Sequence, residues 1–260
     1  MGLPEKLVAR LADMGLTEPT PIQKGAIPFA MDGRDVMGLA QTGTGKTAAF
    51  GLPLVAHIGA MGRPEPKGVQ GLVLAPTREL AGQIADTLRD LTQGSPLKVA
   101  VVVGGQSLNA QAKRLERGVD LLVATPGRLI DLLDRRAVRL DQTRFLVLDE
   151  ADQMLDMGFI HALRQISRHL PAKRQTMLFS ATMPKLMEEL SGEYLDNPQK
   201  VQVSPPGKAA DKIEQSVHFI AKSEKQALLI ELLDTHRDEL ALVFGRTKHG
   251  SEKLMKQLEK

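Results

Sequence analysis

The chain has 260 residues, of which 42% are hydrophobic and 25% charged, and its formal net charge at pH 7 is +3. These proportions are typical of a globular protein with a sizeable core, and the length exceeds that of a typical single domain. The absence of cysteine excludes disulfides and thiolate metal sites. Since no apolar run is long enough for a membrane span or a signal peptide, we expect a cytoplasmic protein without a membrane partner.

Aromatic residues make up only 3% of the chain, with no Trp and one Tyr. The positive net charge permits a polyanionic partner. A protein that reads single-stranded bases by stacking needs several aromatic rings. If the chain binds nucleic acid, we therefore expect contacts mostly to phosphate and sugar, with weak sequence selectivity.

Six short apolar runs predict strands, and the stretches between them predict helices. Each run is continuously apolar instead of alternating, which is typical of strands that are covered on both faces. The alternation of strands and helices predicts an α/β fold with a mostly parallel, doubly wound sheet and helices on both faces. The predicted strands span 35–40, 71–75, 98–103, 120–124, 144–149 and 175–180, and the clearest helices span 79–91 and 159–170.

A stretch of prolines and small residues, "SPPGKAAD" (204–211), interrupts this alternation and predicts a linker. We therefore expect a first domain at 1–203 and an incomplete start of a second domain at 212–260, which is a marginal size for an independent core. Strand-like and helix-like runs alternate in this second part, at 213–220, 223–236, 240–245 and 248–260.

The sequence "AQTGTGKTAAF" (40–50) follows the first predicted strand and opens a helix. Gly43 and Gly45 let the backbone curl so that its N–H groups point at phosphate oxygens, and the helix N-terminus adds partial positive charge. Lys46 can reach terminal phosphates, and the Thr47 hydroxyl can bind Mg²⁺. The strict pattern G-x-x-x-x-G-K-[ST] fails at its first position, which is alanine here. A glycine-rich turn with a chance GKT is therefore the alternative.

Three carboxylates, on Asp149, Glu150 and Asp152, lie at the end of the fifth predicted strand and directly after it. The simplest interpretation is a strand that leaves the core and starts a solvated helix. With a phosphate loop upstream, the acids instead predict a metal and water-activation site. Asp149 would hold Mg²⁺, and Glu150 would polarise the attacking water as a general base.

Taken together, these motifs resemble the DEAD-box ATP-dependent RNA helicases, of a bacterial RhlE-like type. "DEAD" at 149–152 matches the family's signature, the other motifs follow in the family's order, and "AQTGTGKT" is similar to the family's own phosphate loop. The resemblance implies a RecA-like P-loop NTPase fold, with ATP and Mg²⁺ as cofactors. It also implies RNA as the partner, bound mostly through the sugar-phosphate backbone, and ATP hydrolysis coupled to local duplex unwinding.

The resemblance also implies roles at the nucleotide site. "EPTPIQ" (18–23) is similar to the motif whose glutamine reads adenine. "SAT" (180–182) resembles the motif that couples hydrolysis to unwinding, and its Ser and Thr would hydrogen-bond Asp152. The implied nucleotide-binding residues are Gln23, Thr42, Gly43, Thr44, Gly45, Lys46 and Thr47. The implied catalytic residues are Lys46, Asp149 and Glu150, and the implied metal ligands are Thr47 and Asp149. The implied coupling residues are Asp152, Ser180 and Thr182.

Three further motifs resemble the family's RNA-contacting segments, namely "APTREL" (75–80), "GG" (104–105) and "TPGR" (125–128). Their residue types supply charge, hydroxyls and close backbone approach, which suit phosphates and sugars. The implied RNA-binding residues are Pro76, Thr77, Arg78, Gly104, Gly105, Thr125, Pro126, Gly127 and Arg128.

The sequence departs from the family pattern in two places that bear on activity. Leu16 stands where the family often has Phe or Tyr, which implies weaker packing of adenine. "LVFGRTK" (242–248) resembles the first motif of the second domain, but the arginine fingers have no counterpart up to Lys260. Such arginines are worth about 10³–10⁵ in turnover. We therefore expect this chain alone to bind ATP or ADP, to hydrolyse ATP very slowly and not to unwind RNA. The alternatives are a non-catalytic RNA clamp or scaffold, and a DNA translocase.

Overall fold

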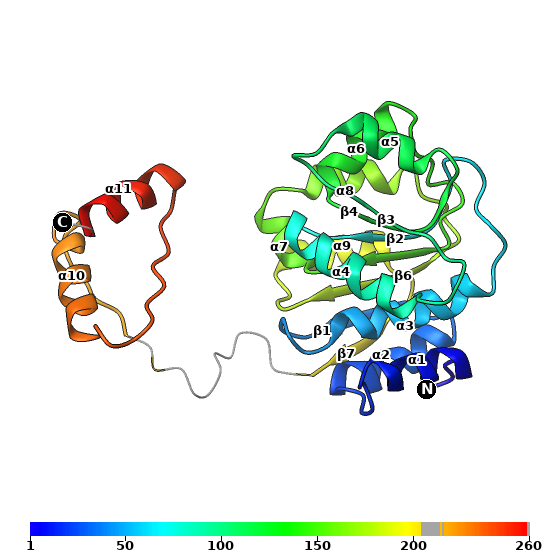
Figure 1. Cartoon of the computed structure of the whole chain (residues 1–260), viewed down its shortest axis with the longest axis horizontal. Coiled ribbons are helices and arrows are strands. Elements are labelled where there is room, and N and C mark those ends of the chain that lie inside the picture. Colours follow the sequence, from blue (N-terminus) through cyan, green and yellow to red (C-terminus); the bar gives the residue numbers. More distant parts are fainter. Residues whose placement is uncertain (204–213, 215, 259–260) are drawn as a thin grey trace. The chain divides into compact units, whose positions relative to one another are not determined.

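The computed structural model of the chain describes residues 1–203, 214 and 216–258, and the chain divides into two compact units, 1–208 and 209–260. The first unit is built on a seven-stranded sheet with the order β3-β4-β2-β5-β6-β1-β7, in which every pairing is parallel (Figure 1). The strands are β1 (Val36–Leu39), β2 (Val69–Leu74), β3 (Val99–Val102), β4 (Val119–Ala124), β5 (Phe145–Leu148), β6 (Gln175–Ser180) and β7 (Gln199–Gln202). The predicted parallel α/β fold is therefore confirmed.

Helices cover both faces of this sheet, which explains why its strands are continuously apolar. Val73 of β2 belongs to the core cluster under the first four helices, whereas its neighbours Leu72 and Leu74 belong to the cluster under the other five. The first layer contains α1 (Glu5–Asp13), α2 (Pro21–Met31), α3 (Lys46–Gly59) and α4 (Arg78–Leu91). The second contains α5 (Leu108–Leu115), α6 (Pro126–Asp134), α7 (Ala151–Asp156), α8 (Ile160–Ser167) and α9 (Lys185–Tyr194).

The chain winds in two directions across the sheet. The connections through α3 and α4 cross the face covered by the first helix layer, and those through α5 to α9 cross the opposite face. Because crossovers between parallel strands are right-handed, connections that run in opposite directions along the sheet must cross opposite faces. All strands run parallel, and their carboxyl ends therefore lie along one edge of the sheet, where open α/β folds bind ligands.

The strand β7 is absent from the sequence-based prediction. Its sequence, QKVQ, carries three polar residues because β7 lies at the edge of the sheet and pairs only with β1. Helix packing does not bury it as it buries the central strands, so it lacks the apolar run by which the other strands are recognised.

The second unit contains the helices α10 (Lys225–Thr235) and α11 (Lys248–Leu258), close to the predicted helical stretches. The strand-like runs at 216–220 and 240–245 form no strand among the described residues, and Phe219 and Leu242 are exposed. A strand requires a partner for its backbone hydrogen bonds, and the described part of this unit contains none. The predicted linker at 204–211 lies outside the described residues.

No helix within the described ranges is both long enough and apolar enough to cross a membrane.

Candidate functional site

The predicted site residues gather along the carboxyl edge of the sheet, in two separate groups. The predicted RNA-binding residues follow β2, β3 and β4, which are neighbours in the sheet. The predicted phosphate-binding, metal and coupling residues follow β1, β5 and β6, which form the adjoining half. Gln23 is the exception because it lies in α2. Motifs that alternate along the sequence are thus brought into two groups by the order of the strands in the sheet.

The loop between β1 and α3 has the backbone curl that the glycine pattern predicts. Gly43 and Gly45 have φ of 78° and 88°, a left-handed conformation that favours glycine. The Thr44 hydroxyl donates to the Gln41 carbonyl at 2.8 Å, which ties the loop to itself. Gly45 is the N-cap of α3, so the loop leads directly into a helix whose first N–H groups lack intrahelical partners. This arrangement can bind an anion.

Gln23 connects α2 to this loop. Its Oε1 accepts a hydrogen bond from the Thr20 backbone N–H at 3.0 Å, and its Nε2 donates to the Gly45 carbonyl at 3.0 Å. A Cβ at Gly45 would come within 2.6 Å of the Gln23 Nε2. Glycine is therefore needed there because a side chain would clash with Gln23 and because the backbone is left-handed. The predicted adenine-reading residue therefore also holds the phosphate loop.

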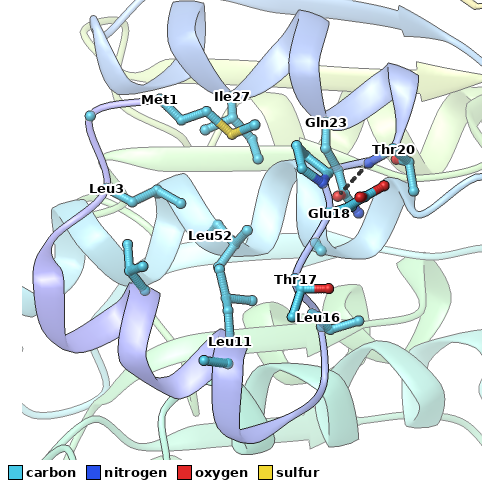
Figure 2. A pocket seen from close by; sticks show the side chains of 15 residues that line it. Met1, Leu3, Leu11, Leu16, Thr17, Glu18, Thr20, Gln23, Ile27 and Leu52 are labelled. Atoms are coloured by element: carbon cyan, nitrogen blue, oxygen red, sulfur yellow. Dashed lines mark hydrogen bonds between the residues drawn. The ribbon is translucent and has the colours of Figure 1, made fainter.

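An apolar cavity of about 500 Å³ adjoins Gln23. Figure 2 shows Gln23 and Thr20 at one end of it, with Leu11 and Leu52 farther along its wall. The cavity lies between α1, the segment that leads into α2, and the first half of α3. Leu16, which is 49% exposed, also lines it. The cavity thus offers apolar surface beside a polar amide group.

A buried charge pair lies between the two predicted phosphate and metal motifs. The Lys46 Nζ is 3.8 Å from Asp149 Oδ1, and the side chains are only 6% and 2% exposed. Burial raises the pKa of the Asp149 carboxyl to about 6, although the Lys46 charge acts in the opposite direction. Because this pKa is below 7, the carboxyl is mostly ionised at neutral pH and can attract a cation.

The Lys46 ammonium is buried and lacks a hydrogen-bond partner among the described residues. A buried donor without an acceptor is costly, and a phosphate oxygen would satisfy it. No group of three or more His, Cys, Asp or Glu side chains that could hold a metal occurs in the described part of the chain. Mg²⁺ commonly uses one or two carboxylates together with phosphates and water. The Thr47 hydroxyl and the Asp149 carboxylate therefore suit Mg²⁺ bound with a nucleotide.

Glu150 has a strained backbone, with φ of 51° and ψ of 51° in the left-handed region. This conformation is uncommon for a residue with a side chain and costs about 1–3 kcal/mol. It produces the sharp turn between β5 and α7, and the Glu150 N–H donates to Asp149 Oδ1 at 3.0 Å. Strain of this kind concentrates at functional sites, in agreement with the proposed role of Glu150.

Asp152 is bonded to the segment that follows β6. Its Oδ2 accepts hydrogen bonds from the Thr182 hydroxyl at 2.9 Å, the Thr182 N–H at 2.9 Å and the Ala181 N–H at 3.2 Å. The expected bond from Thr182 is thus present. The expected bond from Ser180 is not, because its hydroxyl donates to the Thr182 carbonyl at 2.7 Å instead. Ser180 shapes the turn, and the backbone of Ala181 supplies the additional donor.

The predicted RNA-binding residues line a cavity of about 350 Å³ where α4 and α6 begin. Both helices start at the carboxyl ends of the neighbouring strands β2 and β4, so their N-terminal N–H groups lie at the same part of the edge. The Thr77 hydroxyl caps α4 by accepting from the Leu80 N–H at 3.1 Å. Gly105 and Pro126 do not line this cavity, whereas the other seven predicted residues do: Pro76, Thr77, Arg78, Gly104, Thr125, Gly127 and Arg128.

Two arginines add charge to this cavity in different ways. The exposed Arg78 guanidinium lies so close to Gly105 that a Cβ there would be 2.3 Å from the Arg78 Nη1. Arg128 is held more tightly, because its Nη1 donates to the Gln106 carbonyl at 2.9 Å and its Nε is 3.5 Å from Asp131. Arg128 is held by these contacts, whereas the Arg78 side chain makes no hydrogen bond to any described residue, so Arg78 is the arginine that can turn more freely toward a ligand.

The sequence-based prediction missed three residues that line this cavity, namely the acidic Glu79 in the first turn of α4 and the apolar Met157 and Phe159. Met157 and Phe159 follow α7 and look in the sequence like the apolar end of a helix. The signal that distinguishes them is Gly158 between them, which marks a helix C-terminus and thus a change of chain direction.

Comparison with known proteins agrees with this geometry. Residues 20–190 match the family model described as DEAD/DEAH box helicase. The chain is 42% identical over 258 residues to the ATP-dependent RNA helicase CshA of Listeria monocytogenes, covering 99% of this chain and 49% of that protein. It is also similar to the crystal structure of a hypothetical ATP-dependent RNA helicase from Sulfolobus tokodaii, with a TM-score of 0.69 and 35% identity. That match covers 78% of this chain and 57% of the other.

The chain thus spans about half the length of the curated relative that it matches. The matched range 20–190 includes Gln23, the phosphate loop, the DEAD sequence and the segment that bonds Asp152. The chain belongs to the DEAD/DEAH box helicase family.

Proposed function

We propose that this chain is the ATP- and RNA-binding part of an ATP-dependent RNA helicase. The observation that carries the proposal is the division of the sheet edge. One half holds the buried Lys46–Asp149 pair beside a phosphate loop, and the other holds two helix N-termini and two arginines. The family membership and the printed function of the relative from Listeria support the same proposal.

At the nucleotide half, the triphosphate would bind the N–H groups of the loop, including those of Thr42, Gly43 and Thr44. The Lys46 ammonium would donate to the terminal phosphate, and Glu150 would accept the proton of the attacking water. Mg²⁺ on Thr47 and Asp149 would neutralise charge on the phosphates.

The adenine would lie at the polar end of the cavity in Figure 2. Beyond its bonds to Thr20 and Gly45, the Gln23 amide retains one N–H and one lone pair. These suit the acceptor and donor of the adenine edge.

At the other half, phosphates of an RNA backbone would lie at the N-termini of α4 and α6, near Arg78 and Arg128. Asp152, Ser180 and Thr182 would take part in coupling hydrolysis to unwinding, because their hydrogen bonds connect the segment after Glu150 to the segment that follows β6. In the whole protein, hydrolysis would be coupled to local duplex unwinding. We expect residues 1–260 alone to hydrolyse ATP very slowly. A cytoplasmic location stays a prediction.

Replacing Arg78 with alanine tests the RNA site. We expect weaker binding of a fluorescent single-stranded RNA at low salt, measured by anisotropy. The slope of log K against log salt should shrink by about 0.7, since one phosphate contact is lost. Arg63→Ala is the control, because Arg63 is also exposed and the net charge changes equally. Equal weakening by both variants would show a general charge effect and would contradict the site.

A competition with DNA of equal sequence distinguishes the alternatives. We expect RNA to compete better than DNA, because only RNA offers the 2′-hydroxyl to a site that contacts sugars. Equal competition would favour a DNA translocase over a protein that selects RNA.

A further inference from the structure

Met157 and Phe159 form an apolar wall in the cavity that Arg78 and the starts of α4 and α6 also line. Met157 is 49% exposed, so its side chain is accessible at this cavity. Phe159 is half-buried and packs partly against the core under α5 to α9. The cavity therefore joins a polar wall, with two arginines, the helix N-termini and the Glu79 carboxylate, to an apolar wall.

The backbone holds this wall in place. Gly158 has φ of 78°, its N–H donates to the Leu155 carbonyl at 2.9 Å, and the Phe159 N–H donates to the Met154 carbonyl at 2.9 Å. These two bonds and the left-handed glycine make a Schellman motif, which ends α7 and turns the chain. The Phe159 carbonyl then accepts from the Leu163 N–H at 2.8 Å in the first turn of α8. The Met157 and Phe159 side chains are therefore positioned by a turn whose backbone is held by hydrogen bonds.

We propose that Met157 and Phe159 contact the sugar and base of the nucleotide whose phosphate lies at the N-termini of α4 and α6. This inference rests on the proposed RNA-binding function. A nucleotide of single-stranded RNA has the two chemistries that the cavity offers, an anionic phosphate and an apolar ring face. Phe159 is an aromatic group suited to the ring face, and the Met157 thioether adapts to irregular apolar surfaces.

The proposal also explains how a chain with few aromatic residues gains binding energy beyond phosphate contacts. Contact with a ring face tolerates every base, because each base has one. We therefore expect this wall to strengthen RNA binding without making it selective for a base.

Two substitutions test the wall, Met157→Ala and Phe159→Leu, the second of which keeps an apolar side chain against the core. We expect each variant to bind a fluorescent single-stranded RNA about fivefold or more weakly, as for the loss of a base contact. The slope of log K against log salt should stay that of the unmodified chain, since no cationic group is lost. Affinity for MgATP should also be unchanged, and circular dichroism should show an intact fold.

Met61→Ala is the matched control, because Met61 is a methionine that is also exposed, at 37%, and lines a different cavity. It should bind RNA like the unmodified chain. The inference is overturned if Met157→Ala and Phe159→Leu bind RNA normally while Arg78→Ala does not, an outcome that leaves the proposed RNA site standing. If Arg78→Ala also binds normally, the proposed RNA site itself fails, and the inference fails with it.

Discussion

Replacing Lys46 with alanine should lower the affinity for MgATP by about 30-fold or more while changing the stability of the fold little. The loss of affinity follows because a buried ammonium that donates to phosphate is removed, and such truncations cost about 2–5 kcal/mol. Titration calorimetry would measure the affinity. Lys113→Ala is a control with the same charge change at an exposed position in α5.

The small effect of Lys46→Ala on stability follows from the pKa of Asp149. Without the lysine, the ionised carboxyl would be buried with no counter-charge, but the group can take up a proton instead. Because its pKa is about 6, the protonated form lies only on the order of 1 kcal/mol above the ionised form at pH 7. The free energy of unfolding from urea titration should therefore fall by no more than about this amount. A large loss of stability with normal ATP affinity would show that the pair is structural.

Replacing Glu150 with glutamine should slow ATP hydrolysis by about 10²–10⁴-fold, which is the contribution of a general base. The affinity for MgATP should stay within a few-fold. The side chain keeps its size, and the Glu150 N–H can still donate to Asp149 Oδ1. Single-turnover assays with the chain in excess over ATP would measure the rate even where turnover is slow. The exposed Glu189→Gln is the control for charge. Hydrolysis by Glu150→Gln at the unmodified rate would refute the general-base role.

The sequence predicts the central strands well because helices cover both faces of the sheet. Leu72, Val73 and Leu74 are all fully buried, so β2 reads as a continuous apolar run. The edge strand β7 lacks that signal. In the second unit the run at 240–245 has the composition of a strand, but composition does not supply a neighbouring strand.

Individual site motifs are predictable where local backbone chemistry determines them. Gly43 and Gly45 adopt the left-handed conformations that their residue type favours, and Thr77 caps α4. The grouping of the motifs is not predictable locally, because it depends on strand order: β5 pairs with β2 on one side and β6 on the other. The resemblance also implied a hydrogen bond from Ser180 to Asp152. In the structure the Ser180 hydroxyl bonds to the Thr182 carbonyl, and the Ala181 backbone N–H donates to Asp152.

The short helix α7 lies where the two halves of the site meet. It begins immediately after Glu150, and Asp152 in its first turn accepts a hydrogen bond from Thr182. Met157 at its end lines the cavity of the proposed RNA site. A helix of six residues is only about 9 Å long. The proposed ATP and RNA sites are therefore distinct but separated by one short element.

ATP and RNA should bind to different halves of one sheet edge. Mapping of backbone amide chemical shifts, with MgATP and single-stranded RNA added separately, tests it most directly. MgATP should shift the amides of residues 42–47 and Glu150, and RNA should shift those of 77–80, 104–106 and 127–128 together with Met157 and Phe159. Shifts by both ligands in the same half, or by either ligand only outside these residues, would contradict the claim.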